Sequence, residues 1–450
     1  MANCTRCGRE LPAFSTGELS EVCPDCRQAA AAEASAVGVP AITQKVWRPP
    51  VTTALLAMNF AVFAAMVLTG VSSTEPSVPQ LLRWGADWGP FSLSSQPWRM
   101  LTSTFVHIGI IHILLNMWCL WDLGKLSERI FDRWTFLTFY LVCGLAGSIG
   151  SLWWRPEVVS AGASGAIFGI AGLLIAVLKL ANLPFPAHAM RGTLRSLLTF
   201  AGYNLFFGAV RRGTNNAAHI GGLLAGLILG AIVARHLTDR ENLRRTRNLA
   251  LIGAAVVLAL AFYFVQSKNS FLVHFERSVE AFERGDTERT QQELDIALAA
   301  RPNDPLAILF RANRFLKQPN MPANNATQPD GKHYVETLLD AAVKSSANFQ
   351  WSRRILARQL QLDPNDENAR LGLGVTLISL EESAAAIDTL QEAVRRNPQS
   401  DEAWYLLGVS YSRVDRSGDA LQAFKKAAEL KPDNEDYKRA VTEESQGRFK

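Results

Sequence analysis

Long stretches without a charged residue dominate the chain between residues 49 and 267. A hydrocarbon core about 30 Å thick needs roughly 20 apolar residues of helix, which rises about 1.5 Å per residue. Six uncharged runs reach that length, and a shorter seventh can cross only if it packs centrally or if its flanking arginines extend to the interface. The expected membrane helices are 49–74, 100–121, 134–154, 158–178, 196–210, 213–234 and 248–267.

The distribution of charge excludes a uniformly soluble protein. Charged residues make up 19% of the chain, and residues 268–450 are rich in them. The 11 tryptophans and 23 phenylalanines are too many apolar side chains for a wholly disordered chain. The net charge is +5, but no Lys/Arg patch with interleaved aromatics predicts a nucleic-acid partner. The first 40 residues are polar or rich in alanine, so we expect no cleavable signal peptide.

Basic residues between the uncharged runs predict an orientation. With the N-terminus in the cytoplasm, the inner loops hold eleven Lys and Arg residues and the outer loops hold five, as the positive-inside rule requires. Seven crossings then place residues 268–450 on the outer side, but the later orientation inverts if 196–210 does not cross. The inner residues are Lys125, Arg129, Arg133, Lys179, Arg191, Arg195, Arg235, Arg240, Arg244, Arg245 and Arg247, and the outer ones are Arg83, Arg99, Arg155, Arg211 and Arg212.

The C-terminal part repeats. Pro364, Pro398 and Pro432 are spaced 34 residues apart (398 − 364 and 432 − 398), the tetratricopeptide period. A weaker copy ends at Pro302, and 318–332 has the composition of a loop. Since one repeat cannot bury its apolar face, about three must stack, and such a solenoid binds a peptide or protein or is purely structural. The last repeat carries Trp404, Leu407, Gly408, Tyr411, Ala420, Phe424 and Ala427 in phase.

Four cysteines lie within the first 26 residues as two Cys-x-x-Cys pairs, separated by fifteen residues. This spacing is typical of a zinc site in which four thiolates surround the ion. The module is too short for a core, so the metal would supply its folding energy. Disulfides and free thiols are the alternatives, and a cytoplasmic location disfavours disulfides. The ligands expected for a structural zinc are Cys4, Cys7, Cys23 and Cys26.

Polar side chains inside membrane helices are costly and mark candidate functional positions. In the predicted topology His112, Ser164 and His219 lie near the outer ends of three inward-running helices, at a similar depth. Asn116 follows His112 by four residues, so both lie on one helix face. Small residues recur along two of these helices and allow the close approach that a serine and a histidine need. They are Gly165, Gly169 and Gly172, and then Ala218, Gly222, Gly226 and Gly230.

Three segments together resemble the rhomboid family of intramembrane serine proteases. They are His107-x4-His112-x3-Asn116, Gly162-x-Ser164-Gly165 and Ala218-His219-x2-Gly222, and Trp98-Arg99 and Glu128-Arg129 also match family features. The resemblance covers roughly residues 51–236. Phe168 is a departure, because some members carry there a tyrosine that stacks on the catalytic histidine. Phenylalanine keeps the ring, so we expect activity to survive.

The resemblance implies a Ser-His dyad. Ser164 is the expected nucleophile and His219 the base, with no carboxylate in a matching position and no cofactor needed for catalysis. The backbone N–H of Ser164 is an available donor to the oxyanion, and the resemblance adds His112 and Asn116. Gly162, Gly165, Phe168 and Gly222 are the expected structural neighbours. Expected substrates are transmembrane proteins whose helices unwind at small or helix-breaking residues near the outer membrane end.

Other interpretations of these residues remain open. A lone serine in a glycine-rich helix is usually a packing residue, and a membrane histidine is often a structural hydrogen bonder. The whole core could be a catalytically silent scaffold that recruits partners through its repeats, as relatives without the dyad do. Alternatively, His107, His112 and His219 could be metal ligands of a membrane metalloprotease.

The sequence thus predicts a mainly α, multi-pass membrane protein. The expected parts are a zinc-ribbon-like module (1–26), a flexible linker (27–50), a six-span rhomboid-like core (51–236), a seventh membrane helix (248–267) and a solenoid of tetratricopeptide repeats (268–450).

Overall fold

The computed structural model describes residues 7–8, 23, 25–26, 28–29, 49–182, 187–210, 214–237, 239–315 and 346–449. The chain divides into two compact units, Met1–Arg48 and Pro49–Lys450. The described residues form helices and no strand, apart from one isolated bridge between Asp87 and Ser160, which confirms the mainly α class. Most of the predicted linker 27–50 and the predicted loop 318–332 lie outside the described residues.

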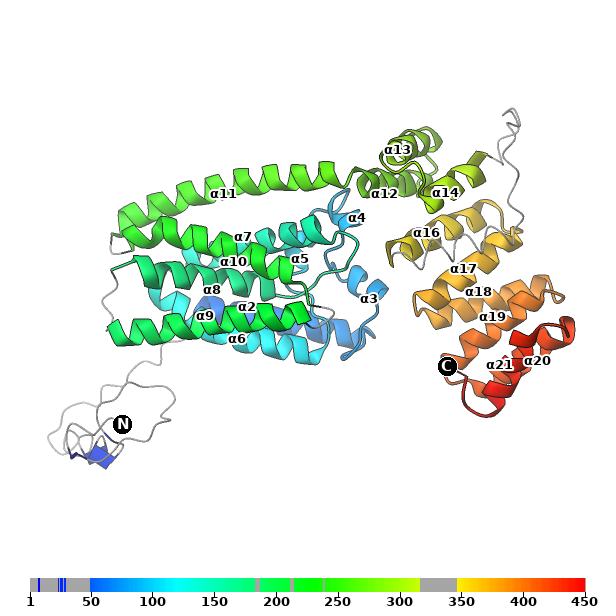
Figure 1. Ribbon diagram of the computed structural model, residues 1–450, viewed down its shortest axis with the longest axis horizontal. Coiled ribbons are helices and arrows are strands. Elements are labelled where there is room, and N and C mark those ends of the chain that lie inside the picture. Colours follow the sequence, from blue (N-terminus) through cyan, green and yellow to red (C-terminus); the bar gives the residue numbers. More distant parts are fainter. Residues whose placement is uncertain are drawn as a thin grey trace. The chain divides into compact units, whose positions relative to one another are not determined.

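Long helices of the membrane core lie roughly along one direction, and short helices join them at one end (Figure 1). The short ones are α3 (Val78–Arg83), α4 (Gly89–Ser92) and α5 (Arg99–Thr102), and the 3-10 turn η1 (Ala234–His236) follows α10. The long ones are α2 (Pro50–Leu68), α6 (Ile110–Ile130), α7 (Arg133–Trp154), α8 (Ser164–Leu180), α9 (Ala187–Val210), α10 (Asn216–Val233) and α11 (Arg240–Lys268).

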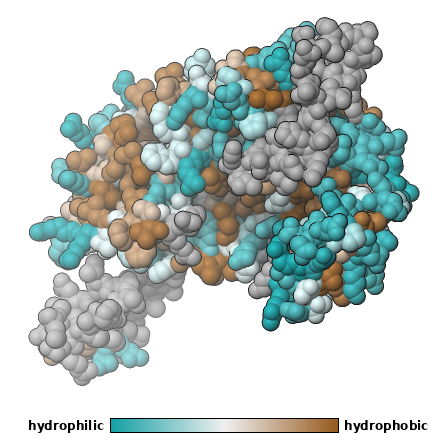
Figure 2. Space-filling model, turned by 45° about the vertical axis from the view of Figure 1, so that its right-hand side comes forward, coloured by the Kyte–Doolittle hydropathy of each residue, from teal (hydrophilic) through white to brown (hydrophobic). Residues whose placement is uncertain are grey.

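Within the described part of the chain, four helical segments are long and apolar enough to cross a membrane. They are Pro50–Leu68, Arg133–Trp154, Asn216–His236 and Glu241–Lys268, and the apolar helix α8 is shorter. Brown, apolar surface covers much of the core, whereas the repeats are mostly teal (Figure 2). Soluble proteins rarely expose so much apolar surface to water, and the apolar helices are long enough to cross a bilayer, so this is an integral membrane protein. On α11, exposed apolar side chains include Leu249, Ile252, Val257 and Leu260.

Among the predicted membrane helices, two have starting points that differ most from the sequence-based boundaries. The helix expected from residue 100 begins only at Ile110, because Gly109 has a φ of +84° and the Ile110 N–H donates to Ser73 O (2.7 Å). In contrast, α9 is longer than the uncharged run 196–210. It begins at Ala187 and has 24 residues, or about 36 Å of helix. The charged residues in its first turns therefore lie within the helix and do not interrupt it.

Contacts at the helix ends show that successive helices of the core run in opposite directions. The loop before α8 meets the start of α10, where Asn215 Nδ2 donates to Ser160 Oγ (3.0 Å). At the same end Lys268 Nζ, the last residue of α11, donates to Trp153 O (3.2 Å) near the end of α7. Since α8 and α10 both start at this end, α9 carries the chain back to it from the far end of α8.

The start of α2 is held by a carboxylate from α6. The first N–H groups of a helix lack partners within the helix, and an anion there also meets the positive end of the helix dipole. Glu128 accepts from Val51 N (3.1 Å), Thr52 N (2.6 Å) and Thr52 Oγ1 (2.6 Å). The helices approach closely there, since a Cβ on Gly124 would lie 2.5 Å from Thr52 Oγ1.

Glycines on α8 and α10 bring these two helices into backbone contact. A Cβ on Gly222 would lie 2.0 Å from Gly165 O, and one on Gly226 would lie 1.8 Å from Gly169 O. No larger residue fits at either position without separating the helices. The two predicted stripes of small residues therefore meet each other, and Ser164 and His219 lie on the two helices they join.

The repeat region consists of successive helical hairpins (Figure 1). Glycines let paired helices approach, since a Cβ on Gly408 would lie 2.6 Å from the ring of Phe424, and one on Gly374 would lie 2.6 Å from Leu390. The helices are α12 (Ser270–Glu283), α13 (Thr287–Ala300), α14 (Pro305–Phe315), α16 (Ser346–Leu362), α17 (Glu367–Ser379), α18 (Ser383–Arg396), α19 (Asp401–Ser412), α20 (Ser417–Leu430) and α21 (Glu435–Ser445).

Candidate active site

Ser164 and His219 meet between two core helices. Ser164 is the first residue of α8, and His219 lies in the first turn of α10. The serine Oγ and the histidine Nε2 are 2.9 Å apart, a hydrogen-bond distance. His219 is 8% exposed and Ser164 is half-buried, so the pair is shielded while the hydroxyl still borders accessible space.

Phe168 holds the imidazole from one side. Its ring is stacked on that of His219, with centroids 4.3 Å apart and planes 4° from parallel. Phe168 lies one helical turn after Ser164 on α8, and Phe200 of α9 contacts its ring at 5.3 Å. The aromatic ring at this position therefore orients the histidine toward the serine.

In the part of the chain that the structure describes, no carboxylate is paired with the second imidazole nitrogen of His219. Among the described residues, His219 Nδ1 is buried without a hydrogen-bond partner. If Nε2 is to accept the serine proton, Nδ1 must carry the ring proton. Within the described residues, the geometry is therefore that of a serine–histidine pair without a third, acidic member.

The segment before Ser164 is shaped by Gly162. This residue has a φ of +128°, and its N–H donates to Ser103 O (2.9 Å). A Cβ there would lie 2.6 Å from His112 Cε1, so the His112 ring packs directly on the glycine. Because Ser164 begins α8, its backbone N–H has no partner within the helix. The His112 ring thus packs against a residue that lies only two positions before this N–H in the chain.

Asn116 lies one turn after His112 on α6. Its side chain is largely buried, and Nδ2 donates to His112 O (2.9 Å) within the same helix. His107 is buried in the loop before α6, with its ring 5.3 Å from that of His112. The described part of the chain has one group of three or more close metal-ligating atoms, which is made of cysteines and contains none of these histidines. This arrangement does not favour the metalloprotease interpretation.

Asn215 is a site neighbour to which the sequence assigned no role. It caps α10 by accepting from Ala218 N (3.2 Å), and it donates to Ser151 Oγ (2.6 Å) on α7 and to Ser160 Oγ (3.0 Å). One side chain thus joins the helix that carries His219 to the segment that leads to Ser164. Asn-x-x-Ala is a recognisable helix cap, but its two serine partners lie 55 and 64 residues away in sequence.

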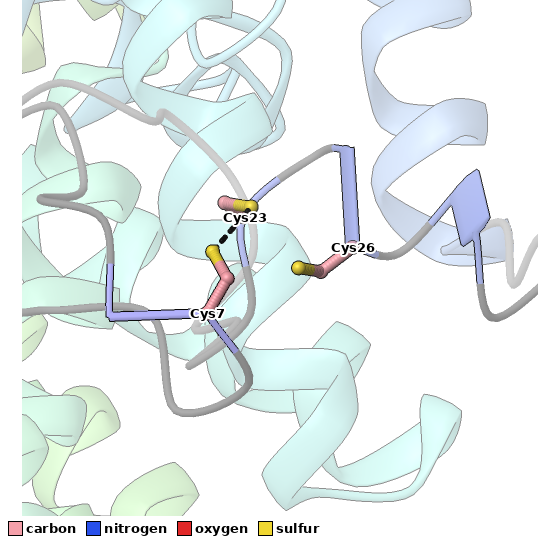
Figure 3. A group of neighbouring side chains, drawn as sticks. All are labelled: Cys7, Cys23 and Cys26. Carbon is pink, nitrogen blue, oxygen red and sulfur yellow. Dashed lines mark hydrogen bonds between the residues drawn. The ribbon is translucent and has the colours of Figure 1, made fainter.

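Three of the four predicted zinc ligands lie together in the N-terminal unit (Figure 3). The Sγ atoms of Cys7, Cys23 and Cys26 lie within 4.8 Å of one another, and those of Cys7 and Cys23 are 3.6 Å apart. A disulfide needs about 2.05 Å, whereas two sulfurs on one tetrahedral zinc, each about 2.3 Å from the ion, are about 3.8 Å apart. The thiols present therefore fit a zinc ion. Cys4 lies outside the described residues.

Comparisons with known proteins found matches to both the membrane core and the repeat region of Pro49–Lys450. A Rhomboid domain model matches residues 94–236, and a Tetratricopeptide repeat model matches residues 336–401 and 371–435. The chain is 32% identical over 218 residues to "Rhomboid protease GluP" of Bacillus subtilis (strain 168), a match that covers 48% of this chain and 40% of that protein. It is 36% identical over 163 residues to "RHOMBOID-like protein 7" of Arabidopsis thaliana, covering 36% of this chain and 51% of that protein.

A third relative is matched over more of its length. "Rhomboid protease AarA" of Providencia stuartii is 26% identical over 245 residues, which cover 49% of this chain and 85% of that protein. The chain spans about half the length of the first two relatives. The segment matched by the Rhomboid domain model includes the helices that carry Ser164 and His219. The chain therefore contains a rhomboid domain, which tetratricopeptide repeats follow in the sequence.

Proposed function

We propose that this protein is an intramembrane serine endopeptidase that cleaves peptide bonds in or near the transmembrane segments of other membrane proteins. The observation that carries the proposal is the 2.9 Å approach of Ser164 Oγ to His219 Nε2, between two apolar helices. Serine and histidine at this distance are the minimum that acyl transfer requires of a nucleophile and its base. Names of relatives that include "Rhomboid protease" support the same activity.

The reaction proceeds in two halves. Ser164 Oγ attacks the scissile carbonyl carbon while His219 Nε2 accepts the hydroxyl proton, and the carbonyl oxygen becomes an oxyanion. His219 then gives that proton to the leaving amine, the C–N bond breaks, and an acyl-enzyme remains. A water molecule, deprotonated by His219, attacks the ester carbonyl. Collapse of this second intermediate returns the proton to Ser164 Oγ and releases the carboxyl product.

Oxyanion stabilisation is assigned to three groups. The Ser164 N–H is one of the unpaired donors at the start of α8, where the helix dipole also favours negative charge. His112 packs on Gly162, two residues before the nucleophile. Asn116 lies one turn further along α6, and its amide has a second hydrogen besides the one donated to His112 O. Fixed donors of this kind typically contribute about 10²–10³-fold each to kcat.

The preferred substrates follow from helix physics. The peptide groups of a membrane helix are hydrogen-bonded to one another, so the helix must unwind locally before the peptide bond can be cut. Glycine and proline lower the cost of that unwinding. We therefore expect cleavage near such residues, close to the outer end of a substrate helix. A catalytically silent scaffold would need neither the Ser164–His219 approach nor the Phe168 stack, so these contacts favour the enzyme.

A reconstituted cleavage assay tests the proposed function. The full chain in liposomes is expected to cut a co-inserted reporter whose membrane helix contains a Gly or Pro near one end. A fluorophosphonate should block this cleavage, because it reacts with an activated serine, whereas EDTA should leave the rate unchanged. Loss of activity with EDTA and resistance to the fluorophosphonate would favour a metalloprotease instead.

We also propose that the seven long core helices cross the bilayer, with the N-terminal unit in the cytoplasm and the repeats outside. The eleven-to-five distribution of Lys and Arg supports this orientation, and so does the passage of α9 back to the end of the core where α10 begins. Epitopes inserted at Ser20 and Lys450 should lie on opposite sides of sealed vesicles, so that an added protease digests one of them and leaves the other intact. Exposure of both epitopes on one side would contradict seven crossings.

For the N-terminal unit we propose a structural zinc held by Cys4, Cys7, Cys23 and Cys26. With four thiolate ligands the ion has no open position for catalysis, and its contribution is folding energy. Elemental analysis of the purified chain should find one zinc per molecule. Cys23→Ser should lower that content, while Cys143→Ser in α7 should not. Equal zinc content in the Cys23 variant and the unaltered protein would refute the site.

A further inference from the structure

The first helices of the repeat region pack on an outer loop of the membrane core. Both belong to the compact unit Pro49–Lys450. Trp88, just before α4, and Trp351, on α16, are each 1% exposed, and their ring centroids are 6.1 Å apart. They share one hydrophobic cluster with Phe271 and Phe275 of α12. Two buried indole rings in contact form a rigid joint between the loop and the repeats.

Buried charges reinforce this joint. Glu276 on α12 is fully buried and accepts from Trp351 Nε1 (2.7 Å) and from Arg354 (2.5 Å). Burial raises the pKa of the Glu276 carboxyl to about 7, and Arg354 opposes that rise. The Arg354 guanidinium also lies 5.5 Å from the ring centroid of Phe91 in α4. Removing one partner of a buried ion pair strongly destabilises a protein, because the other charge is left buried and unpaired. The pair of Glu276 and Arg354 therefore holds α12 and α16 in a single arrangement.

The same loop is bonded to the segment that leads to Ser164. Asp87 and Ser160 exchange two backbone hydrogen bonds, of 2.9 and 2.8 Å. Gly89 N donates to Pro156 O (2.8 Å), and Trp88 Nε1 donates to Glu157 O (3.2 Å). Four hydrogen bonds therefore join residues 87–89 to residues 156–160.

Ser160 is in turn connected to both members of the dyad. It lies four residues before Ser164, and its hydroxyl accepts from Asn215, the cap of the helix that carries His219. A shift of the 156–160 segment would thus change the position of the serine relative to the imidazole. Misplacement of reacting groups by about 1 Å can cost about 10²-fold in rate.

We propose that Trp88 and Trp351 are positioning residues of the protease, through which α12 and α16 hold the outer loop on the 156–160 segment and so fix the separation between Ser164 and His219. The repeats are then a structural part of the active centre. The inference rests on the proposed function for its effect on rate, but the mechanical connection can be measured without any activity.

The experiment uses the full chain in detergent or liposomes. Trp351→Ala should lower kcat for the reporter about tenfold with KM unchanged, because the dyad is misaligned but substrate contacts remain. Backbone amides of Asp87 and Ser160 should exchange hydrogen at least about tenfold faster, since opening their bridge becomes easier. Trp88→Ala should act alike, and the double variant should be little worse than either single one. Trp351→Phe, which keeps a ring, should recover most of kcat.

Phe424→Ala supplies the matched control. Phe424 is fully buried in the last repeats, so its loss destabilises that part of the array without touching the joint. It should leave both kcat and the exchange at Asp87 and Ser160 unchanged. An equal effect of Phe424→Ala and Trp351→Ala would overturn the inference, as would unchanged exchange in Trp351→Ala. If hydrogen exchange is faster in Trp351→Ala but the unaltered protein cleaves no reporter, the connection between the repeats and the 156–160 segment stands and the proposed function is rejected.

Discussion

Ser164→Ala should abolish cleavage of a membrane-tethered reporter. Without the hydroxyl no acyl-enzyme forms, and His219 loses the atom it approaches at 2.9 Å. Loss of the nucleophile in a serine protease can cost about 10⁶-fold in kcat, so we expect at least a 10⁴-fold loss here. Quantitative immunoblotting of the product in liposomes, over times from minutes to days, would cover that range.

The fold should survive this change, because the hydroxyl contributes one hydrogen bond, worth about 1 kcal/mol. Thermal unfolding of Ser164→Ala should therefore stay close to that of the unaltered protein. Ser196→Ala provides a matched serine control, since Ser196 is exposed on α9 and its hydroxyl donates to Gly192 O of its own helix. Residual cleavage above a hundredth of the normal rate in Ser164→Ala would remove the serine from the mechanism.

Gly162→Ala should reduce cleavage about 10²-fold while Ser164 and His219 are both retained. The φ of +128° at Gly162 costs an alanine roughly 1–3 kcal/mol, and the added methyl group would lie 2.6 Å from His112 Cε1. His112 or the serine segment must shift, and either change misplaces a group assigned to the reaction. Initial rates at saturating reporter would measure the loss.

Gly192→Ala is the control for the added methyl group. That glycine is exposed on α9, and a Cβ there would meet no atom within 4 Å. Alanine is better than glycine in a helix by about 1 kcal/mol, so stability should hold or rise with cleavage unchanged. Normal cleavage by Gly162→Ala would show that the close approach to His112 has no role in the reaction.

Much of this site could be predicted from the sequence because membrane insertion is a one-dimensional constraint. Uncharged runs set where helices cross, and their alternation placed His112, Ser164 and His219 near a single depth. Small residues on two of those helices predicted their close contact, and the Gly222–Gly165 approach confirms it. The 34-residue period likewise predicted helix pairs whose contacts, such as Gly408 with Phe424, are observed.

What the sequence could not provide depends on contacts between distant segments. The bridge from Asp87 to Ser160 joins two loops that carry no periodic signal. Asn215 binds Ser151 and Ser160 through a side-chain geometry that exists only once three helices have assembled. Helix α9 extends past Arg191 and Arg195 because charged side chains near a helix end do not break it, whereas a hydropathy criterion excludes them. The contact of Trp88 with Trp351 joins residues 263 positions apart (351 − 88).

The most direct test of the central claim is the site and rate of covalent labelling by a fluorophosphonate. Phosphonylation replaces the serine proton, which a neighbouring base must accept. Intact-mass and peptide mass spectrometry of the full chain should find one adduct, on Ser164. The adduct should be absent in Ser164→Ala and form at least about 10³-fold more slowly in His219→Ala. An adduct on another residue, or labelling of Ser164 at the same rate without His219, would contradict the pairing of this serine with this histidine.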